Sequence, residues 1–203
     1  MIGIIDYGIG NISSIRNMLD YLEIECRVIT RPEQIAEVNK LILPGVGSFD
    51  NAMYNLKNQG WISPLNDGVI KKKMPILGIC LGMQLMTNSS EEGSSSGLGW
   101  INAKTLKFKK TPGFRIPHMG WNTVKVKSKS RLLIGLSEMT YLRFYFVHSF
   151  YVSLENGSDE AMSTQYGYEF TSSFAKENIF GVQFHPEKSH KYGMKLLSNF
   201  SRL

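Results

Sequence analysis

Strand-like apolar runs and amphipathic segments alternate through the first ninety residues of the chain. The strand-like runs are residues 2–5, 26–29, 41–43 and 76–79. Between the first two runs, apolar residues recur at helical spacing from Ile12 to Leu22, and Asn11 is suited to cap that helix. Strands that alternate with helices predict a parallel sheet covered by helices.

Further helices and turns follow from local residue types. Glycines predict a turn over residues 6–10, and the segment 91–97 (EEGSSSG) predicts a surface loop. More helices are expected at residues 48–57, just after Pro64, at 83–87, and after Ser189, which is suited to cap the last helix.

The second half of the chain has a different pattern, in which short strand-like runs dominate. These runs include Thr123–Val126, Phe144–Val147, Phe170–Phe174 and Ile179–Phe184. We therefore expect one α/β domain over residues 1–203. It would contain an open, mostly parallel central sheet flanked by helices, with a β-rich second half.

The length and composition agree with one globular domain. The chain has 203 residues, of which 42 % are hydrophobic and 20 % are charged. Its two cysteines, Cys26 and Cys80, form neither a disulfide framework nor a zinc-binding pattern. We expect a reduced, cytoplasmic protein, because neither a signal peptide nor a run of about 18 apolar residues is visible.

The net charge of +6 does not by itself indicate a nucleic-acid-binding protein. The lysines cluster at residues 71–73 and 107–110. Basic patches can bind nucleic acid, but these are not interleaved with stacking aromatics, and we interpret them as solvated faces.

Cys80 is the strongest candidate for a chemical role. It lies in Gly78-Ile79-Cys80-Leu81-Gly82, between a strand-like run and an expected helix. This is the form of a nucleophile elbow with cysteine in place of serine, where flanking glycines relieve crowding. A helix N-terminus beside the sulfur favours the thiolate. The alternative, a small buried hydrophobic side chain, is our interpretation of Cys26.

A thiol nucleophile needs a base, and histidine titrates near neutrality. Of the four histidines, His185 ends an apolar strand and precedes Glu187 by two residues. In extended chain such residues point to the same side, so Glu187 can orient His185. The alternative is that His185-Pro186-Glu187 is only a polar turn.

Amide cleavage also needs N–H groups aimed at the developing oxyanion. The Leu81 amide is one natural donor, because it directly follows the nucleophile. The glycine-rich turn of Gly45, Val46 and Gly47 follows a neighbouring strand and is expected at the same edge of the sheet. A simple strand-to-helix turn would explain that segment equally well.

These motifs together resemble the class I (triad) glutamine amidotransferases, which have a flavodoxin-like fold. The resemblance rests on Pro44-Gly45-Val46-Gly47, the Cys80 elbow through Gln84, and His185-Pro186-Glu187. Over essentially the whole chain, further segments resemble the glutaminase subunit of imidazole glycerol phosphate synthase. These are residues 6–11, 117–122, 145–149 and 185–189.

The resemblance implies a Cys80-His185-Glu187 triad that hydrolyses L-glutamine without a cofactor or a metal. It implies that Gln84, Glu92, Ser149, Phe150 and Tyr151 bind the glutamine.

The resemblance also implies a partner. The ammonia would pass to a barrel-shaped cyclase subunit in a heterodimer, which makes imidazole glycerol phosphate and the ribonucleotide AICAR in histidine biosynthesis. Residues matching the interface with that subunit are Met119, Gly120, Trp121, Asn122, Tyr145 and Lys188. Neither nucleic acid nor a membrane is expected as a partner.

Three alternatives remain open at the level of sequence. A similar glutaminase subunit could supply ammonia for amidation of a surface-polysaccharide sugar. A cysteine hydrolase of the dienelactone-esterase type could use the same elbow, although without a His-Pro-Glu segment. The chain could also be an inert, partner-binding relic, against which the intact Cys80, His185 and Glu187 argue.

Overall fold

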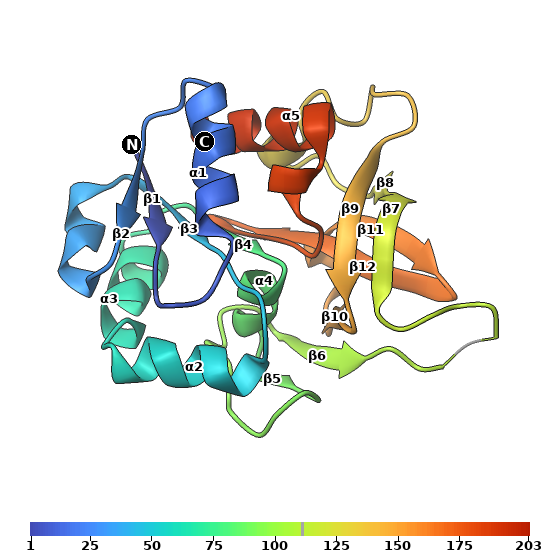
Figure 1. The fold of residues 1–203 in the computed structure, drawn as a ribbon, viewed down its shortest axis with the longest axis horizontal. Helices are drawn as coiled ribbons and strands as arrows, with labels where there is room; N and C mark the ends of the chain where they lie inside the picture. The colour runs from blue at the N-terminus through green and yellow to red at the C-terminus, as the bar shows by residue number, and fades with distance from the viewer. Residues whose placement is uncertain (111) are drawn as a thin grey trace.

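The computed structural model of the chain describes residues 1–110 and 112–203. Among these residues, an eleven-stranded sheet has the order β2-β1-β3-β4-β13-β12-β10-β6-β5, with β11 paired to β12 and β8 paired to β11, and a second sheet consists of β7 and β9 (Figure 1). The strands are β1 Ile2–Ile5, β2 Cys26–Ile29, β3 Lys40–Leu43, β4 Ile76–Ile79, β5 Ser89–Ser90, β6 Ala103–Lys107, β7 His118–Thr123, β8 Lys125–Val126, β9 Arg143–His148, β10 Phe150–Leu154, β11 Glu160–Tyr166, β12 Tyr168–Lys176 and β13 Ile179–Val182.

Helices cover both faces of the parallel part of the sheet. In Figure 1, α1 and α5 lie on one side of it and α2 and α3 on the other. The helices are α1 Ile12–Tyr21, α2 Phe49–Asn58, α3 Ile62–Asn66, α4 Leu81–Leu85 and α5 His190–Ser201, with short helices η1 Pro32–Glu37, η2 Asp67–Lys71, η3 Arg131–Leu133, η4 Gly157–Asp159 and η5 Pro186–Lys188.

Alternation along the strands divides the apolar residues between two cores. Ile42 of β3 packs in the core beneath α1 and α5, whereas its neighbours Leu41 and Leu43 pack in the core beneath α2 and α3. In β4, Leu77 and Ile76 are divided in the same way. Successive side chains of a strand point to opposite faces, so both faces of an internal parallel strand must be apolar.

The expected parallel sheet is confirmed for the first half of the chain. β1 pairs with β2 and β3, and β4 pairs with β3 and β13, all in parallel. From β13 to β6 the pairings are antiparallel, since β12 pairs with β13, β10 and β11 in this way and β10 pairs so with β6. The two-residue edge strand β5 is parallel to β6. This is the β-rich second half that the sequence predicts.

Two local expectations are wrong. The strand expected over Thr123–Val126 is two strands, because the chain leaves β9 after Thr123 and pairs with β11 from Lys125. The helices after Asn11 and Ser189 begin where expected, but neither side chain makes a capping hydrogen bond within the described chain. The Ser189 hydroxyl instead donates to the His185 carbonyl at 2.6 Å and accepts from the Tyr145 amide at 3.0 Å.

The helix α5 packs directly against the segment that carries the predicted base. A Cβ at Gly193 would lie 1.8 Å from the Pro186 carbonyl oxygen, so only glycine fits there without a shift of the backbone. The close approach holds residues 185–187 against the helix.

We predict that Gly193→Ala lowers the free energy of unfolding by about 1–3 kcal/mol, as overpacking does. Helix propensity alone would give the opposite sign, since alanine is favoured over glycine by about 1 kcal/mol in a helix interior. Urea denaturation measures the difference. Gly157→Ala is the control, because a Cβ there meets nothing within 4 Å in the described structure. A stabilised Gly193→Ala variant would contradict the close packing.

Candidate active site

Cys80 occupies a sharp turn between β4 and α4. Its backbone has φ +54° and ψ −111°, a conformation that is costly for a residue with a side chain. A Cβ at Gly82 would lie 1.9 Å from the Leu43 carbonyl oxygen, and one at Gly78 would lie 2.7 Å from the Gly82 oxygen. The two glycines are therefore required by close backbone approach, as the elbow interpretation predicts.

The elbow meets two other turns at one edge of the sheet. The strands β3, β4 and β13 are parallel neighbours, so the residues that follow them emerge on the same side. They enclose a cavity of about 360 Å³. Its lining residues are Val46, Gly47, Cys80, Leu81, Gln84, Glu92, Pro117, Val147, His148, Ser149, Phe150 and His185.

His185 and Glu187 form the expected pair. The Glu187 Oε1 atom accepts a hydrogen bond from His185 Nδ1 at 2.8 Å, and both side chains are almost fully buried. The other ring nitrogen, Nε2, makes no hydrogen bond within the described residues and belongs to the ring that lines the Cys80 cavity.

The charge state of His185 is set by its neighbours. Burial lowers the pKa of His185, but interactions with Cys80 and with Glu187 outweigh burial and raise the pKa to about 10. At neutral pH His185 therefore favours the imidazolium form. A cationic ring beside a cysteine is a setting in which the reactive thiolate forms.

Two buried glutamines surround the sulfur. Gln183 Nε2 donates to Cys80 Sγ at 3.7 Å, and its Oε1 accepts from Gln84 Nε2 at 3.0 Å. Gln84 Nε2 also donates to the Phe150 carbonyl at 3.2 Å. Sequence reasoning selected Gln84 and missed Gln183. The available signal was a polar side chain within the apolar run 179–184.

The oxyanion candidates lie beside the elbow. Gly45 packs on α4, where a Cβ would lie 2.7 Å from the Gly82 nitrogen, while Val46 and Gly47 line the cavity. The Leu81 amide is the first of α4, where N–H groups lack an intrahelical acceptor. The turn of residues 45–47 is fixed by the buried Tyr7 hydroxyl, which donates a hydrogen bond to the preceding Pro44 carbonyl at 2.8 Å. Burial, and then the charge of Cys80, raise the pKa of Tyr7, so this donor keeps its proton.

Glu92 lies on a loop that is fixed to the first turn of α2. Its Oε2 accepts from the Phe49 amide at 2.8 Å, so the carboxylate stabilises the helix N-terminus while lining the cavity. Asp50 fixes the same loop by accepting from the amides of Ser94 and Ser95, and these bonds lower its pKa.

The other residues assigned to glutamine binding divide into two groups. Ser149 and Phe150 line the cavity, at the junction of β9 and β10. Tyr151 is not among the lining residues and instead packs against the rings of Phe108 and Tyr168.

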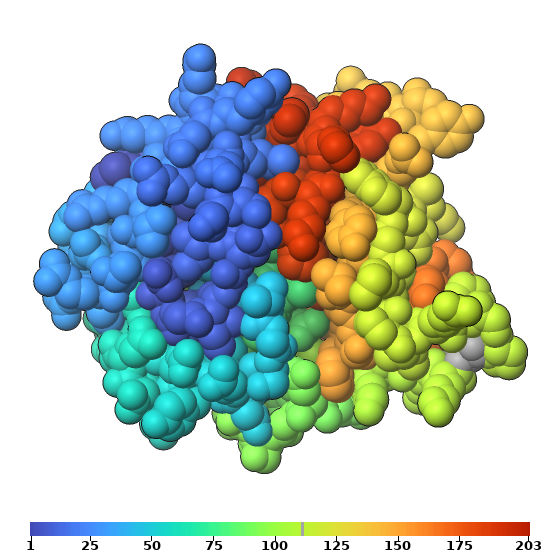
Figure 2. Space-filling view, in the orientation of Figure 1, coloured from blue at the N-terminus to red at the C-terminus, as the bar shows by residue number. Residues whose placement is uncertain are grey.

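The residues assigned to the partner interface lie on and around β7. Met119 and Trp121 are exposed on its outer face, and Tyr145 of β9 packs edge-on against Trp121. The Lys188 ammonium lies 5.8 Å from the Tyr145 ring. Figure 2 shows β7 and β9 side by side on one surface, next to the C-terminal segment. Asn122 points the other way, because alternate residues of a strand face opposite sides, and its amide donates to the Gln165 carbonyl.

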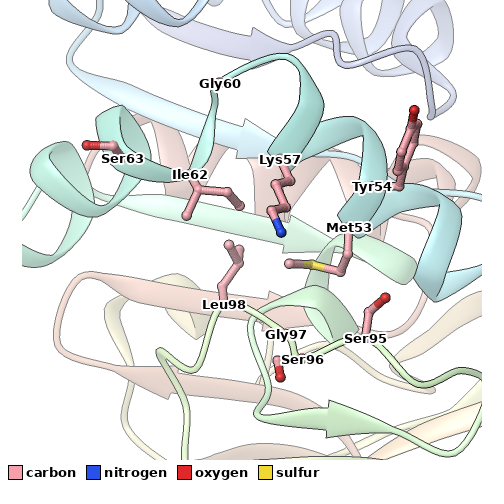
Figure 3. A pocket seen from close by; sticks show the side chains of 10 residues that line it. All are labelled: Met53, Tyr54, Lys57, Gly60, Ile62, Ser63, Ser95, Ser96, Gly97 and Leu98. Carbon is pink, nitrogen blue, oxygen red and sulfur yellow. The ribbon is translucent and has the colours of Figure 1, made fainter.

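A larger cavity, of about 780 Å³, lies elsewhere in the molecule. It is bounded by α2, the start of α3 and residues 95–98, and Figure 3 shows Met53, Lys57 and Leu98 around it. Its lining residues contain neither a cysteine nor a histidine. The chemistry therefore points to the smaller cavity around Cys80.

Neither a metal-binding cluster nor a membrane-spanning helix occurs within residues 1–110 and 112–203. No group of three or more His, Cys, Asp or Glu side chains there could hold a metal ion. The helices in the same residues are too short and too polar to cross a membrane.

Residues 3–202 match the family glutamine amidotransferase class-I. The chain therefore belongs to the class-I glutamine amidotransferases.

Individual relatives define the place of the chain within this family more narrowly. The chain is 58 % identical over 200 residues to "Imidazole glycerol phosphate synthase subunit HisH 2" of Methanococcus maripaludis, which covers 98 % of both chains. It is 44 % identical over 203 residues to the protein of the same name in Pseudomonas aeruginosa, which covers both chains completely. At this similarity the chain belongs to the HisH subunits.

Solved structures agree on the fold. A chain of PurLQS from Thermotoga maritima has a TM-score of 0.76 at 16 % identity, covering 99 % of this chain and 97 % of that one. A structure described as glutamine amidotransferase has a TM-score of 0.73 at 16 % identity, with the same coverage. This similarity confirms the class-I amidotransferase fold.

We predict that Glu187→Gln lowers kcat for glutamine hydrolysis by about a hundredfold or more, because the base loses its orienting carboxylate. It also removes one cause of the raised His185 pKa, which is about 10. A raised pKa keeps the proton on His185 until the pH rises through that value. The alkaline limb of kcat/KM should therefore move to lower pH in the variant. An unchanged alkaline limb would show that Glu187 does not hold the imidazolium.

Proposed function

We propose that this chain is the glutaminase subunit of imidazole glycerol phosphate synthase, in which Cys80 attacks L-glutamine and the released ammonia passes to a cyclase subunit. The observation that carries the proposal is the cavity in which Cys80, in a strained elbow, faces His185, itself bonded to Glu187 at 2.8 Å. The names of the relatives, at up to 58 % identity over nearly the full length, support the pathway.

The first chemical step is formation of a thioester. With the thiol proton of Cys80 held by His185, the sulfur adds to the side-chain amide carbon of glutamine, and the carbonyl oxygen becomes negatively charged. We assign the Leu81 amide and the turn of Gly45, Val46 and Gly47 to stabilise that charge. His185 then gives its proton to the amide nitrogen, the C–N bond breaks, and ammonia leaves.

The second step is hydrolysis of the glutamyl thioester. Neutral His185 takes a proton from water, the hydroxide adds to the thioester carbon, and glutamate leaves as the C–S bond breaks. This restores the thiolate and the imidazolium. Glu187 keeps Nδ1 protonated throughout, so that Nε2 faces the reacting atoms.

Substrate selection follows from the lining of the cavity. We assign Gln84, Glu92 and the backbone of Ser149, Phe150 and Tyr151 to hold the amino-acid part of glutamine. Glu92 is the one carboxylate of the lining residues and supplies a counter-charge for the α-ammonium group.

The partner in this proposal is a barrel-shaped cyclase subunit in a heterodimer. It would cover the surface of Met119, Gly120, Trp121, Tyr145 and Lys188, and Asn122 would act from the inner face of β7. Direct transfer favours the reaction because free ammonia is mostly protonated at neutral pH, and an ammonium ion is not a nucleophile. We propose that the single domain works in the cytoplasm, without a nucleic acid or membrane partner.

We predict that Cys80→Ala lowers glutamine hydrolysis by at least about a thousandfold in the complex with the cyclase subunit. The same complex should still make imidazole glycerol phosphate when ammonium salts replace glutamine. Release of glutamate and formation of the product are measured separately. Cys26→Ser is the matched control, since Cys26 is a half-buried free thiol outside the cavity, and it should keep activity. Glutaminase activity in Cys80→Ala would exclude the proposed nucleophile.

Growth of a histidine auxotroph tests the pathway. The wild-type gene should restore growth of a strain that lacks its own glutaminase subunit when the matching cyclase gene is present. Failure to complement, with intact glutaminase activity in the complex, would favour ammonia supply to a surface-polysaccharide sugar. Ester hydrolysis without glutamine hydrolysis would favour a cysteine esterase.

We predict that Trp121→Ala weakens binding of the cyclase subunit by about tenfold or more, because a large aromatic is removed from the centre of the proposed contact. Isothermal titration of the two purified subunits gives the change in Kd. Tyr54→Ala is the control, since Tyr54 is an exposed aromatic on α2 beside the larger cavity. Equal binding by wild type and Trp121→Ala would move the interface elsewhere.

A further inference from the structure

A chain of buried and partly buried hydrogen bonds connects the inner face of β7 to the nucleophile. Asn122 Nδ2 bonds to His118 Nε2 at 3.2 Å, and His118 Nδ1 bonds to His148 Nε2 at 2.9 Å. His148 Nδ1 then bonds to the Phe150 carbonyl at 2.7 Å. From that carbonyl the path continues through Gln84 and Gln183 to Cys80 Sγ.

The path defines the proton positions on both histidines. The Phe150 carbonyl can only accept, so His148 carries its proton on Nδ1 and accepts at Nε2. The His118 Nδ1 atom must therefore donate, which leaves its Nε2 as an acceptor for the Asn122 amide. The geometry is satisfied only by two neutral rings of the same tautomer.

The surroundings of the two rings favour this neutral state. His118 is stacked between Phe146 and Tyr166, with ring centroids 4.6 Å and 3.9 Å away. Burial lowers the pKa of His118 to about 4 and that of His148 to about 3.

We propose that His118 and His148 are positioning residues. They couple the position of β7 to the glutamine-binding backbone at Phe150 and, through it, to the side-chain amides of Gln84 and Gln183 beside Cys80. The proposal rests on the proposed function, since it concerns that glutaminase site. His148 and Gln84 both donate a hydrogen bond to the Phe150 carbonyl, which can only accept. The path therefore cannot carry a proton from one end to the other. Its role is to fix geometry.

The two faces of β7 explain how the partner acts on this network. Met119 and Trp121 are exposed on the outer face, and His118 and Asn122 lie on the inner face of the same strand. A strand is stiff along its length, so a cyclase subunit seated on the outer side fixes the position of the inner side. The histidine pair passes that position to the Phe150 carbonyl.

The test compares His118→Phe with Tyr166→Phe in the complex with the purified cyclase subunit. His118→Phe keeps a ring between Phe146 and Tyr166 but removes both hydrogen bonds and leaves His148 Nε2 without its donor. We expect the ratio of glutaminase kcat with the partner to kcat without it to fall by about tenfold, with a higher KM for glutamine. Tyr166→Phe removes only the bond to the Arg115 carbonyl, outside the path, and should keep both values within about twofold.

A second variant covers the case in which His118→Phe does not fold. Asn122→Ala breaks the outer end of the path at a half-buried position and should lower the same ratio in the same direction. Wild-type values in both variants, or an equal loss in Tyr166→Phe, would overturn the proposal. If the wild-type complex itself failed to hydrolyse glutamine, the proposed function would fail instead, whatever the variants did.

A spectroscopic measurement tests the tautomers directly. In protein labelled with ¹⁵N-histidine, two-bond ¹H–¹⁵N spectra distinguish a proton on Nδ1 from one on Nε2. We expect His118 and His148 to remain neutral, with the proton on Nδ1, from about pH 5 to pH 8. A proton on Nε2 of either ring, or a charged ring at neutral pH, would contradict the network.

Discussion

The structure depends on how closely three backbone turns approach one another at the end of the parallel sheet. The strands β3, β4 and β13 end side by side, and α4 begins at once after Cys80, against the Leu43 carbonyl. Side chains at Gly45 or Gly82 would separate the turn after β3 from the elbow, and one at Gly78 would push α4 away from β4. The strain stored at Cys80 persists only because packing on both faces of the sheet holds the strands in place. The nucleophile, the oxyanion turn and the base are thus positioned by one piece of packing.

Within that small volume, histidine is used in two opposite charge states. His185 lies beside Glu187 and Cys80, and their interactions raise its pKa, so it holds its proton despite burial. His118 and His148 are surrounded by aromatic rings and a carbonyl, so burial keeps them neutral. Only the neighbours differ, and they assign one ring to proton transfer and two rings to fixed hydrogen bonds.

The sequence was sufficient for the parallel half of the fold and for expecting Cys80, His185 and Glu187 close together. Apolar strands, helical spacing and the glycines around Cys80 are local signals, and His185 and Glu187 are two residues apart. The antiparallel half was predicted only in outline, because which strand pairs with which depends on contacts far apart in sequence. β7 and β9, for instance, pair His118 with His148 across thirty positions. Gln183 was missed for the same reason, since its partners Cys80 and Gln84 come from another strand and helix.

The family match supplied what geometry could not, namely the identity of the amide and of the partner. Cys80 beside a base would suit several acyl-transfer reactions, and the cavity of about 360 Å³ would accept many small amides. The exposed pair of Met119 and Trp121 indicates a contact surface without saying what covers it.

Because the network passes through the Phe150 carbonyl, the residue at position 150 can change without loss of this junction. The carbonyl accepts from His148 on one side and from Gln84 on the other, and so joins the two halves of the network. It belongs to the main chain, and no replacement of the side chain at this position deletes it. Alignments and alanine scans would both pass over it, because they see only side chains. The junction therefore persists when the side chain at position 150 changes. Replacing the peptide bond between Phe150 and Tyr151 with an ester by chemical synthesis would weaken it.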